Sequence, residues 1–159
     1  MTRVALVPGV LAILPAYASI EDPVAELRAA CLDAVSWLGR EVTVLADDQG
    51  TRIAAHLLDV TDQAHDEPSY LVVANGSATR TEKAPGHFDA RAEAFDRELG
   101  HSLRAGRPDV DAVLADELWA SVGALSAMRE LSPLGPAQVD YDAAPFGVQY
   151  WVMRWTGTQ

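Results

Sequence analysis

The 159-residue chain contains one cysteine, Cys31, and one lysine, Lys83. A single cysteine excludes an internal disulfide, and Cys31 lies in a helical apolar pattern, so we predict an inert core thiol rather than a nucleophile. Long apolar runs are also missing, since none approaches the roughly 18 residues that a membrane span requires. The chain has 12 Lys and Arg against 23 Asp and Glu, a net charge of −11. Nucleic acid and anionic membrane surfaces would be repelled, so neither is an expected partner.

The length and composition fit one soluble domain, 1–159, with a core of ordinary size. Apolar residues make up 49% of the chain and charged residues 22%. The opening segment "MTRVALVPGVLAILPAYAS" has an arginine, a short apolar stretch and a small-residue "AYA" site, as a signal peptide does. However, Pro8, Gly9 and Pro15 interrupt its apolar run and favour a strand followed by a loop. We therefore expect a cytoplasmic protein.

The order of apolar patterns predicts the fold. β-branched and apolar runs indicate strands over 3–7, 41–46 and 69–74, and a hairpin formed by the tail on either side of 144–147. Helical spacing is found in four places: from Asp22-Pro23 to Gly39, over 52–60 as one or two turns, from Phe88 to Leu103, and over 109–131 with a break near Asp116 or Gly123. This alternation predicts an α/β single-domain sandwich with a mostly parallel central sheet flanked by helices.

Three successive strands of this prediction end in polar loops, over 8–20, 47–52 and 75–87. In open α/β sheets, ligands bind outside the carboxyl ends of the strands, so these loops are the expected site. The candidate ligand-binding residues that they carry are Asp47, Asp48, Gln49, Asn75, Ser77, Thr79, Arg80, Lys83 and His87.

The third loop has the chemistry of an anion site. Asn75-Gly76-Ser77 offers backbone N–H groups and a hydroxyl, and Arg80 and Lys83 add two cations, which together suit a carboxylate or a phosphate. The Gly-x4-Gly-Lys-Ser/Thr spacing of a P-loop is missing. The alternative is a structural loop, in which the two cations pair with carboxylates nearby in the sequence, namely Glu82, Asp89 or Glu93.

Other kinds of site have less support in the sequence. Ser77 lies in "NGSAT", without the Gly-x-Ser-x-Gly elbow of a serine hydrolase. The histidine spacings and the lone cysteine do not predict a zinc site, so no metal is expected. Asp47 and Asp48 could bind a hard cation or act as a base, but adjacent carboxylates after a strand more often form a turn. The tryptophans at 119, 151 and 155 are predicted to be core or rim residues, with a subunit contact as the alternative.

Three segments carry a resemblance that spans nearly the whole chain: "VPGVLAILP" (7–15), "VVANGSATRTEKAPGHFDARAEAFDREL" (72–99) and "VDYDAAPFGVQYWVMRW" (139–155). Together they resemble the small class III extradiol ring-cleavage dioxygenase, subunit-B-like proteins. These are distant relatives of the protocatechuate 4,5-dioxygenase B subunit and of Memo-type proteins. The resemblance implies the fold of an extradiol dioxygenase B subunit.

Ring-cleaving enzymes of that family hold Fe(II) with two histidines and a carboxylate, and a further histidine acts as acid and base. The resemblance would place the first ligand at Val7-Pro8-Gly9-Val10, the second at Asp47-Asp48-Gln49 and the catalytic histidine within 76–80. None of these segments contains a histidine, and only Glu117 could supply the carboxylate. The resemblance therefore implies the fold without the family's iron chemistry.

These observations lead to three hypotheses. The first is a metal-free protein without a cofactor that binds a small anionic or aromatic molecule, with Arg80 and Lys83 receiving an anionic group. The second is a ring-cleaving oxygenase whose atypical Fe(II) site would be formed by Asp47, Asp48, His87 and Glu117. The third is an interaction protein that forms homo-oligomers through its tryptophan-rich tail strand, which contains Trp151 and Trp155.

Overall fold

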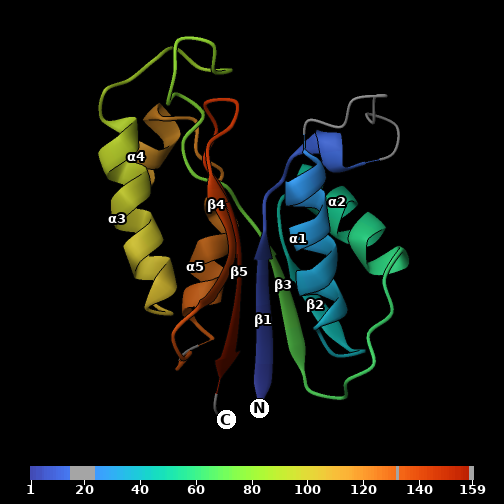
Figure 1. Ribbon diagram of the computed structural model, residues 1–159. Helices are drawn as coiled ribbons and strands as arrows, with labels where there is room; N and C mark the ends of the chain where they lie inside the picture. Colours follow the sequence, from blue (N-terminus) through green and yellow to red (C-terminus); the bar gives the residue numbers. More distant parts are fainter. Residues whose placement is uncertain (15–23, 132, 158–159) are drawn as a thin grey trace.

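In the computed structural model, five strands form one mixed sheet with helices on both faces (Figure 1). The structure describes residues 1–14, 24–131 and 133–157. The strands are β1 (Thr2–Val7), β2 (Val42–Leu45), β3 (Ser69–Val73), β4 (Gln138–Ala143) and β5 (Tyr150–Gly157). Their order across the sheet is β2-β3-β1-β5-β4.

The strand directions correct the prediction of a mostly parallel sheet. β2, β3 and β1 are parallel to one another, but β5 runs antiparallel to both of its neighbours, β1 and β4. The short connection between β4 and β5 makes these two strands antiparallel to each other, so one of them must run against the three parallel strands, and that one is β5, which lies beside β1. The fold is therefore α/β with a mixed sheet.

Two groups of helices cover the two faces of the sheet (Figure 1). The helices on one face are the 3-10 turn η1 (Leu11–Ile13), α1 (Ala25–Ser36) and α2 (Asp48–Asp59). Those on the other are α3 (Ala92–Arg104), α4 (Ala112–Glu117) and α5 (Gly123–Arg129). None of the helices in the described residues is long and apolar enough to cross a membrane.

The central strands are buried on both faces, which explains their unbroken apolar sequence. In β1, Ala5 and Val7 belong to the core under α1 and α2, and Val4 and Leu6 to the core under α3 to α5. Alternate residues of β5 divide between the two cores in the same way. Its two tryptophans belong to the core under α3 to α5 and are 2% or less exposed. The indole N–H of Trp155 donates to the Leu103 carbonyl at 2.8 Å, which satisfies its polar group. The structure thus places the tail tryptophans in the core.

The second helix is longer than predicted. The sequence indicated one or two turns over 52–60, but α2 begins at Asp48 and has 12 residues. Asp47 accounts for the difference, because its Oδ1 accepts the Gly50 N–H at 2.7 Å and caps the helix directly after β2. The adjacent carboxylates are therefore a helix start rather than a loop.

The helix predicted from Phe88 begins only at Ala92, and the Phe88 side chain is 55% exposed. The carboxylate of Asp89 accepts the backbone N–H of Arg91 at 2.9 Å, a local turn that competes with helix formation. Hydrogen bonds from the Arg91 side chain and backbone lower the pKa of Asp89 to about 2.

The break predicted within 109–131 is confirmed, since α4 ends at Glu117 and α5 begins at Gly123. The helix predicted to begin at Asp22-Pro23 is present as α1, but those two residues lie outside the described ones.

The environment of Cys31 leads to a first testable prediction. The side chain is fully buried in α1, and burial raises the pKa of its thiol to about 12 although the charge of Arg28 acts in the opposite direction. Because the thiolate is the reactive form, the native protein should not react with Ellman's reagent at pH 8 within an hour. Unfolding in guanidinium should release one reactive thiol, read by absorbance. Rapid modification of the native protein would contradict the assignment of Cys31 to a closed core.

Candidate functional site

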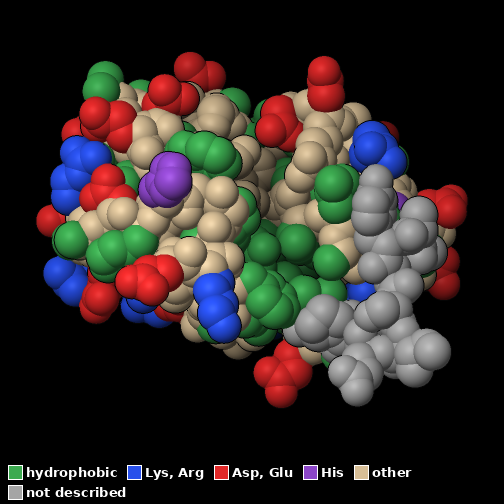
Figure 2. Space-filling view, turned by 90° about the horizontal axis from the view of Figure 1, so that it is seen from above, with side chains coloured by type: hydrophobic (Ala, Val, Ile, Leu, Met, Phe, Trp, Pro, Cys, Tyr) green, Lys and Arg blue, Asp and Glu red, His purple; other side chains and the backbone are tan. Residues whose placement is uncertain are grey.

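The three loops predicted to form the site meet at the carboxyl ends of β1, β2 and β3. The side-chain oxygen of Asn75 accepts the Gly9 N–H at 2.7 Å, and the Gln49 amide donates to the Gly9 carbonyl at 2.7 Å. Seen from this end, hydrophobic side chains gather in the middle of the face and acidic ones lie around its rim (Figure 2). The polar groups of Asn75 and Gln49 thus tie the loops to one another.

A fourth segment, the turn between α4 and α5, joins this edge of the sheet. Asn75 and Ser121 exchange two backbone hydrogen bonds of 2.9 and 3.1 Å, and the Ser121 hydroxyl donates to Asp47 Oδ2 at 3.4 Å. Asp47 and Asp48 are both exposed, but Asp48 lies in the first turn of α2 and not beside Ser121. The turn therefore places a hydroxyl beside Asp47 that the sequence pattern did not indicate.

An open cleft of about 590 Å³ lies between the ends of β2 and β3 and the α4–α5 pair. Its walls are mostly alanine and valine side chains, from Val44 and Val73 on the sheet side to Ala115 and Ala124 on the helix side. Of the described residues, three with polar side chains line it, and all three can accept hydrogen bonds: Asp47, Asp116 and Ser121.

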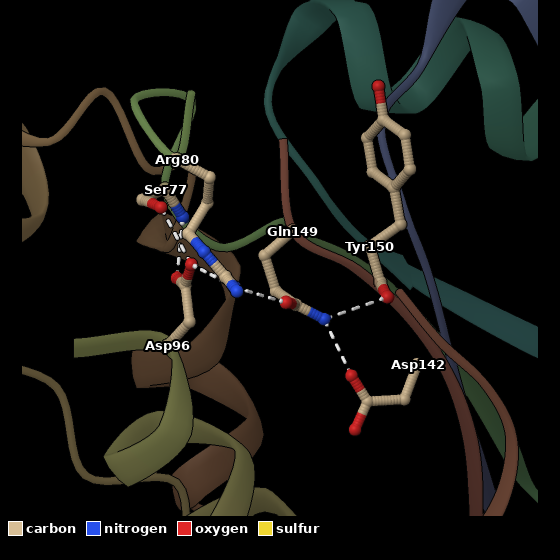
Figure 3. Close-up of polar contacts among 6 residues, drawn as sticks. All are labelled: Ser77, Arg80, Asp96, Asp142, Gln149 and Tyr150. Atoms are coloured by element: carbon tan, nitrogen blue, oxygen red, sulfur yellow. Dashed lines mark hydrogen bonds and ion pairs between the residues drawn. The ribbon is translucent and has the colours of Figure 1, made fainter. Parts of the chain in front are cut away.

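The segment after Asn75 turns away from this cleft and toward α3. There the Asp96 carboxylate accepts the Ser77 backbone N–H at 2.8 Å, the Ser77 hydroxyl at 2.7 Å and the Arg80 guanidinium at 3.3 Å (Figure 3). Asp96 is only 3% exposed. Burial raises its pKa above the ordinary value of an aspartate, and the hydrogen bonds from Ser77 and Arg80 offset part of this rise.

Arg80 also begins a chain of polar contacts that crosses to the C-terminal hairpin (Figure 3). Its Nη1 donates to Gln149 Oε1 at 2.9 Å, and Gln149 Nε2 donates to Asp142 Oδ1 at 2.7 Å. Asp142 in turn accepts Arg104 Nη2 at 2.6 Å. The sequence predicted carboxylate partners for Arg80 if the loop was structural, but the partner is Asp96 rather than Glu82, Asp89 or Glu93.

Gly76 makes the approach to Asp96 possible. A Cβ at this position would lie 2.5 Å from Asp96 Oδ1 and 2.9 Å from the ring of Trp151. Both contacts are closer than carbon atoms tolerate, so any side chain would push the segment away from α3. The "NGS" sequence is therefore explained by packing against α3.

The remaining candidates are dispersed. Thr79 is 2% exposed, and its hydroxyl has no hydrogen-bond partner among the described residues. Lys83 lies in a surface recess beside Phe146, and His87 lies in another beside Phe88 and Trp119. The structure thus brings Asp47, Gln49 and Asn75 together, but it does not bring the two cations to them.

Within the described residues, no three His, Cys, Asp or Glu side chains are close enough together to hold a metal ion. The residues proposed for an atypical iron site, Asp47, Asp48, His87 and Glu117, therefore do not form one ligand set. Glu117 instead pairs with Arg91 at 3.4 Å. These residues do not fit Fe(II), and no step of a ring-cleaving reaction is derived from them.

No protein-family model matches the chain, and the search of curated proteins finds no match to it. The resemblance to extradiol dioxygenase B subunits therefore stays a prediction. The function proposed below depends on the chemistry of the cleft and of the residues around it.

Asp96 is the main site residue that the sequence analysis missed. A signal was present, because Asp96 follows Ala92 by four residues and precedes Leu99 by three, which places it on the apolar stripe of its helix. A carboxylate on a buried stripe requires hydrogen-bond donors from another element. Its partners Ser77 and Arg80 are 19 and 16 residues away in the sequence.

The Asp96 contacts lead to a second prediction. Replacing Asp96 with Ala removes the acceptor of the buried Ser77 N–H and hydroxyl and leaves Arg80 without its carboxylate. Loss of one member of such a buried set should lower the free energy of unfolding by about 3 kcal/mol, measured by urea denaturation at pH 7.

Arg104→Ala is the matched control, since it breaks an ion pair of the same network that is exposed to solvent. Its cost should stay within about 1 kcal/mol. Equal effects of the two substitutions would show that the buried carboxylate has no special part in stability.

Proposed function

We propose that the protein binds a small molecule with an apolar or aromatic body in the cleft between β2, β3 and the α4–α5 pair. The observation that carries the proposal is the cleft itself. Its volume of about 590 Å³ is that of a typical small-molecule site, and its small apolar side chains leave room for a ring. It lies at the carboxyl ends of parallel strands, where open α/β sheets bind their ligands.

The polar groups of the cleft favour a ligand that donates hydrogen bonds. Asp47 is held in place by the Gly50 N–H and lies beside the Ser121 hydroxyl, so its carboxylate does not need to be ordered by the ligand. Asp116 adds a second carboxylate to the lining. A hydroxyl or amine group on the ligand would be attracted to this end of the cleft, whereas a carboxylate would be repelled.

Of the anionic and aromatic ligands predicted from the sequence, the aromatic class fits this cleft better. Arg80 is the cation predicted to receive an anion, but it lines a different and smaller recess of about 230 Å³ against α3. Its Nη1 is already bonded to Asp96 and Gln149. The proposal therefore keeps a metal-free small-molecule binder and gives the recognition of its polar end to Asp47 and Ser121.

The proposal predicts which simple aromatic compounds bind. Benzyl alcohol has a ring and a hydroxyl, and benzoate has the same ring and a carboxylate. In ¹H–¹⁵N NMR titrations, benzyl alcohol should shift the amide signals of Asp47, Ser121 and Gly123, and benzoate should bind at least fivefold more weakly.

Gly123→Leu tests whether the cleft is the site. Gly123 lines the cleft, and a Cβ added there meets no atom within 4 Å, so a leucine can enter the open space without strain. This substitution should weaken benzyl alcohol binding at least tenfold. Ser126→Leu is the control, because Ser126 is exposed on the same helix and does not line the cleft. Unchanged binding by the Gly123→Leu protein, or tighter binding of benzoate, would contradict the proposal.

A further inference from the structure

A second recess, of about 610 Å³, is formed by the 82–88 segment and the end of α4. Trp119, Phe88 and His87 give it three aromatic rings, and Glu82 gives it a carboxylate. Trp119 and Phe88 are 59% and 55% exposed, so large parts of both rings are open to solvent. Among the described lining residues, none is shared between this recess and the cleft of the proposed function.

The backbone of Trp119 is unusual for a residue with a side chain. Its φ is 59°, in the left-handed region, and it is the one non-glycine residue with a positive φ in the described part of the chain. The Trp119 N–H donates to the Asp116 carbonyl at 3.2 Å, and the Ala120 N–H donates to the Ala115 carbonyl at 2.9 Å. This pair of bonds is the Schellman motif that ends many helices, and its left-handed position is usually occupied by glycine.

A tryptophan at this position is therefore not explained by the folding of α4. Glycine would adopt the same conformation at no steric cost, whereas any side chain raises the energy of the left-handed backbone. Because Trp119 is 59% exposed as a residue, packing returns only part of that energy. An exposed aromatic residue kept in a costly conformation is typical of a binding surface.

The neighbouring loop holds the indole ring from one side. A Cβ at Gly86 would lie 3.2 Å from Trp119 Cδ2 and 2.7 Å from Thr79 Cγ2, so the missing side chain lets the loop lie against the ring. The Gly86 N–H is fixed by the Ala78 carbonyl at 3.0 Å. The recess is thus built from a fixed ring and a loop packed against it, and Phe88 lies on the same loop.

We propose that this recess binds an organic cation, a quaternary ammonium or methylated amine group, between Trp119 and Phe88, with Glu82 as the counter-charge. Aromatic rings attract cations through their electron-rich faces, and tryptophan does so best. The described lining of the recess contains no lysine or arginine, and the chain has a net charge of −11. The Glu82 carboxylate and the negative net charge of the chain would both repel an anion.

Trp37 provides an internal comparison. Arg3 and Arg154 lie 4.9 and 5.4 Å from the centre of its ring, so this tryptophan already has cations from the chain itself. Among the described residues, no such contact is recorded for Trp119. Arginine side chains occupy the space beside the Trp37 ring, whereas the corresponding space beside the Trp119 ring is open to a ligand.

Choline and 3,3-dimethyl-1-butanol test the proposal, because the alcohol has the shape of choline with carbon in place of the charged nitrogen. We expect choline to shift the Trp119 indole N–H signal in ¹H–¹⁵N NMR at pH 8, where imidazole groups in water are mostly uncharged. The neutral alcohol should bind at least fivefold more weakly. Equal binding of the two compounds would show that the recess recognises shape or apolar surface alone, and no shift with 50 mM choline would show that it does not bind cations.

Trp119→Gly separates binding from folding. The variant should keep or raise the thermal unfolding midpoint, because glycine suits the left-handed position, and it should lose the choline response measured on the other residues of the recess. A large loss of stability would overturn the inference, since it would show that Trp119 is kept for the fold. Phe88→Ala, in an exposed loop, should weaken choline binding at least threefold, and unchanged binding would also count against the site.

Two controls distinguish this recess from the rest of the surface. Phe146→Ala removes an aromatic side chain that is 44% exposed and lines a different recess, so choline binding should not change. Gly123→Leu fills the cleft of the proposed function and should likewise leave choline binding unchanged. A loss of choline binding in the Gly123→Leu protein would place the cation in the cleft and overturn the assignment to Trp119.

Discussion

The buried carboxylate of Asp96 is the interaction on which the shape of the molecule at the carboxyl ends of β1, β2 and β3 depends. It receives the backbone N–H and hydroxyl of Ser77 and the guanidinium of Arg80, and so fixes to α3 the segment that leaves β3. A buried charge is costly unless several donors satisfy it, which makes this contact selective for one arrangement of the segment. Gly76 permits the close approach. The Asp96 carboxylate, its donors and this glycine together explain the 75–80 segment, whose sequence otherwise resembles an anion-binding loop.

Once this segment is fixed, two separate recesses follow on either side of the turn after α4. Asn75 pairs with Ser121 and brings the turn to the edge of the sheet, where the apolar cleft opens beside Asp47. On the other side, the Ala78 N–H donates to the Leu118 carbonyl at 2.9 Å, next to the exposed ring of Trp119. The same short turn therefore contributes an acceptor group, the Ser121 hydroxyl, to one recess and an aromatic ring, that of Trp119, to the other.

The sequence predicts the elements of the fold better than it predicts their assembly. Apolar runs and helical spacing located the strands and the broken helix between 109 and 131, because these patterns reflect local burial. The mixed direction of the sheet was missed because the tail pattern predicted the β4–β5 hairpin but did not indicate that β5 would pair with β1. At the site, parallel strands end at one edge of the sheet, and this rule predicted that the loops carrying Gln49 and Asn75 lie close together. Both side chains hydrogen-bond to the Gly9 backbone. The pairing of Arg80 with a carboxylate was one of the two alternatives, but its partner, Asp96, was missed because it lies on a helix and not in the loops that the rule considers.

Hydrogen exchange at the Ser77 amide tests the central claim most directly. If the Asp96 carboxylate fixes the segment after β3, this amide should exchange as slowly as the Leu6 and Val72 amides in the centre of the sheet, which open only when the whole protein unfolds. The measurement requires only the wild-type protein in deuterated buffer, with NMR spectra recorded over hours to days. Exchange of the Ser77 amide within minutes, at the rate of the exposed Lys83 amide, would contradict the claim.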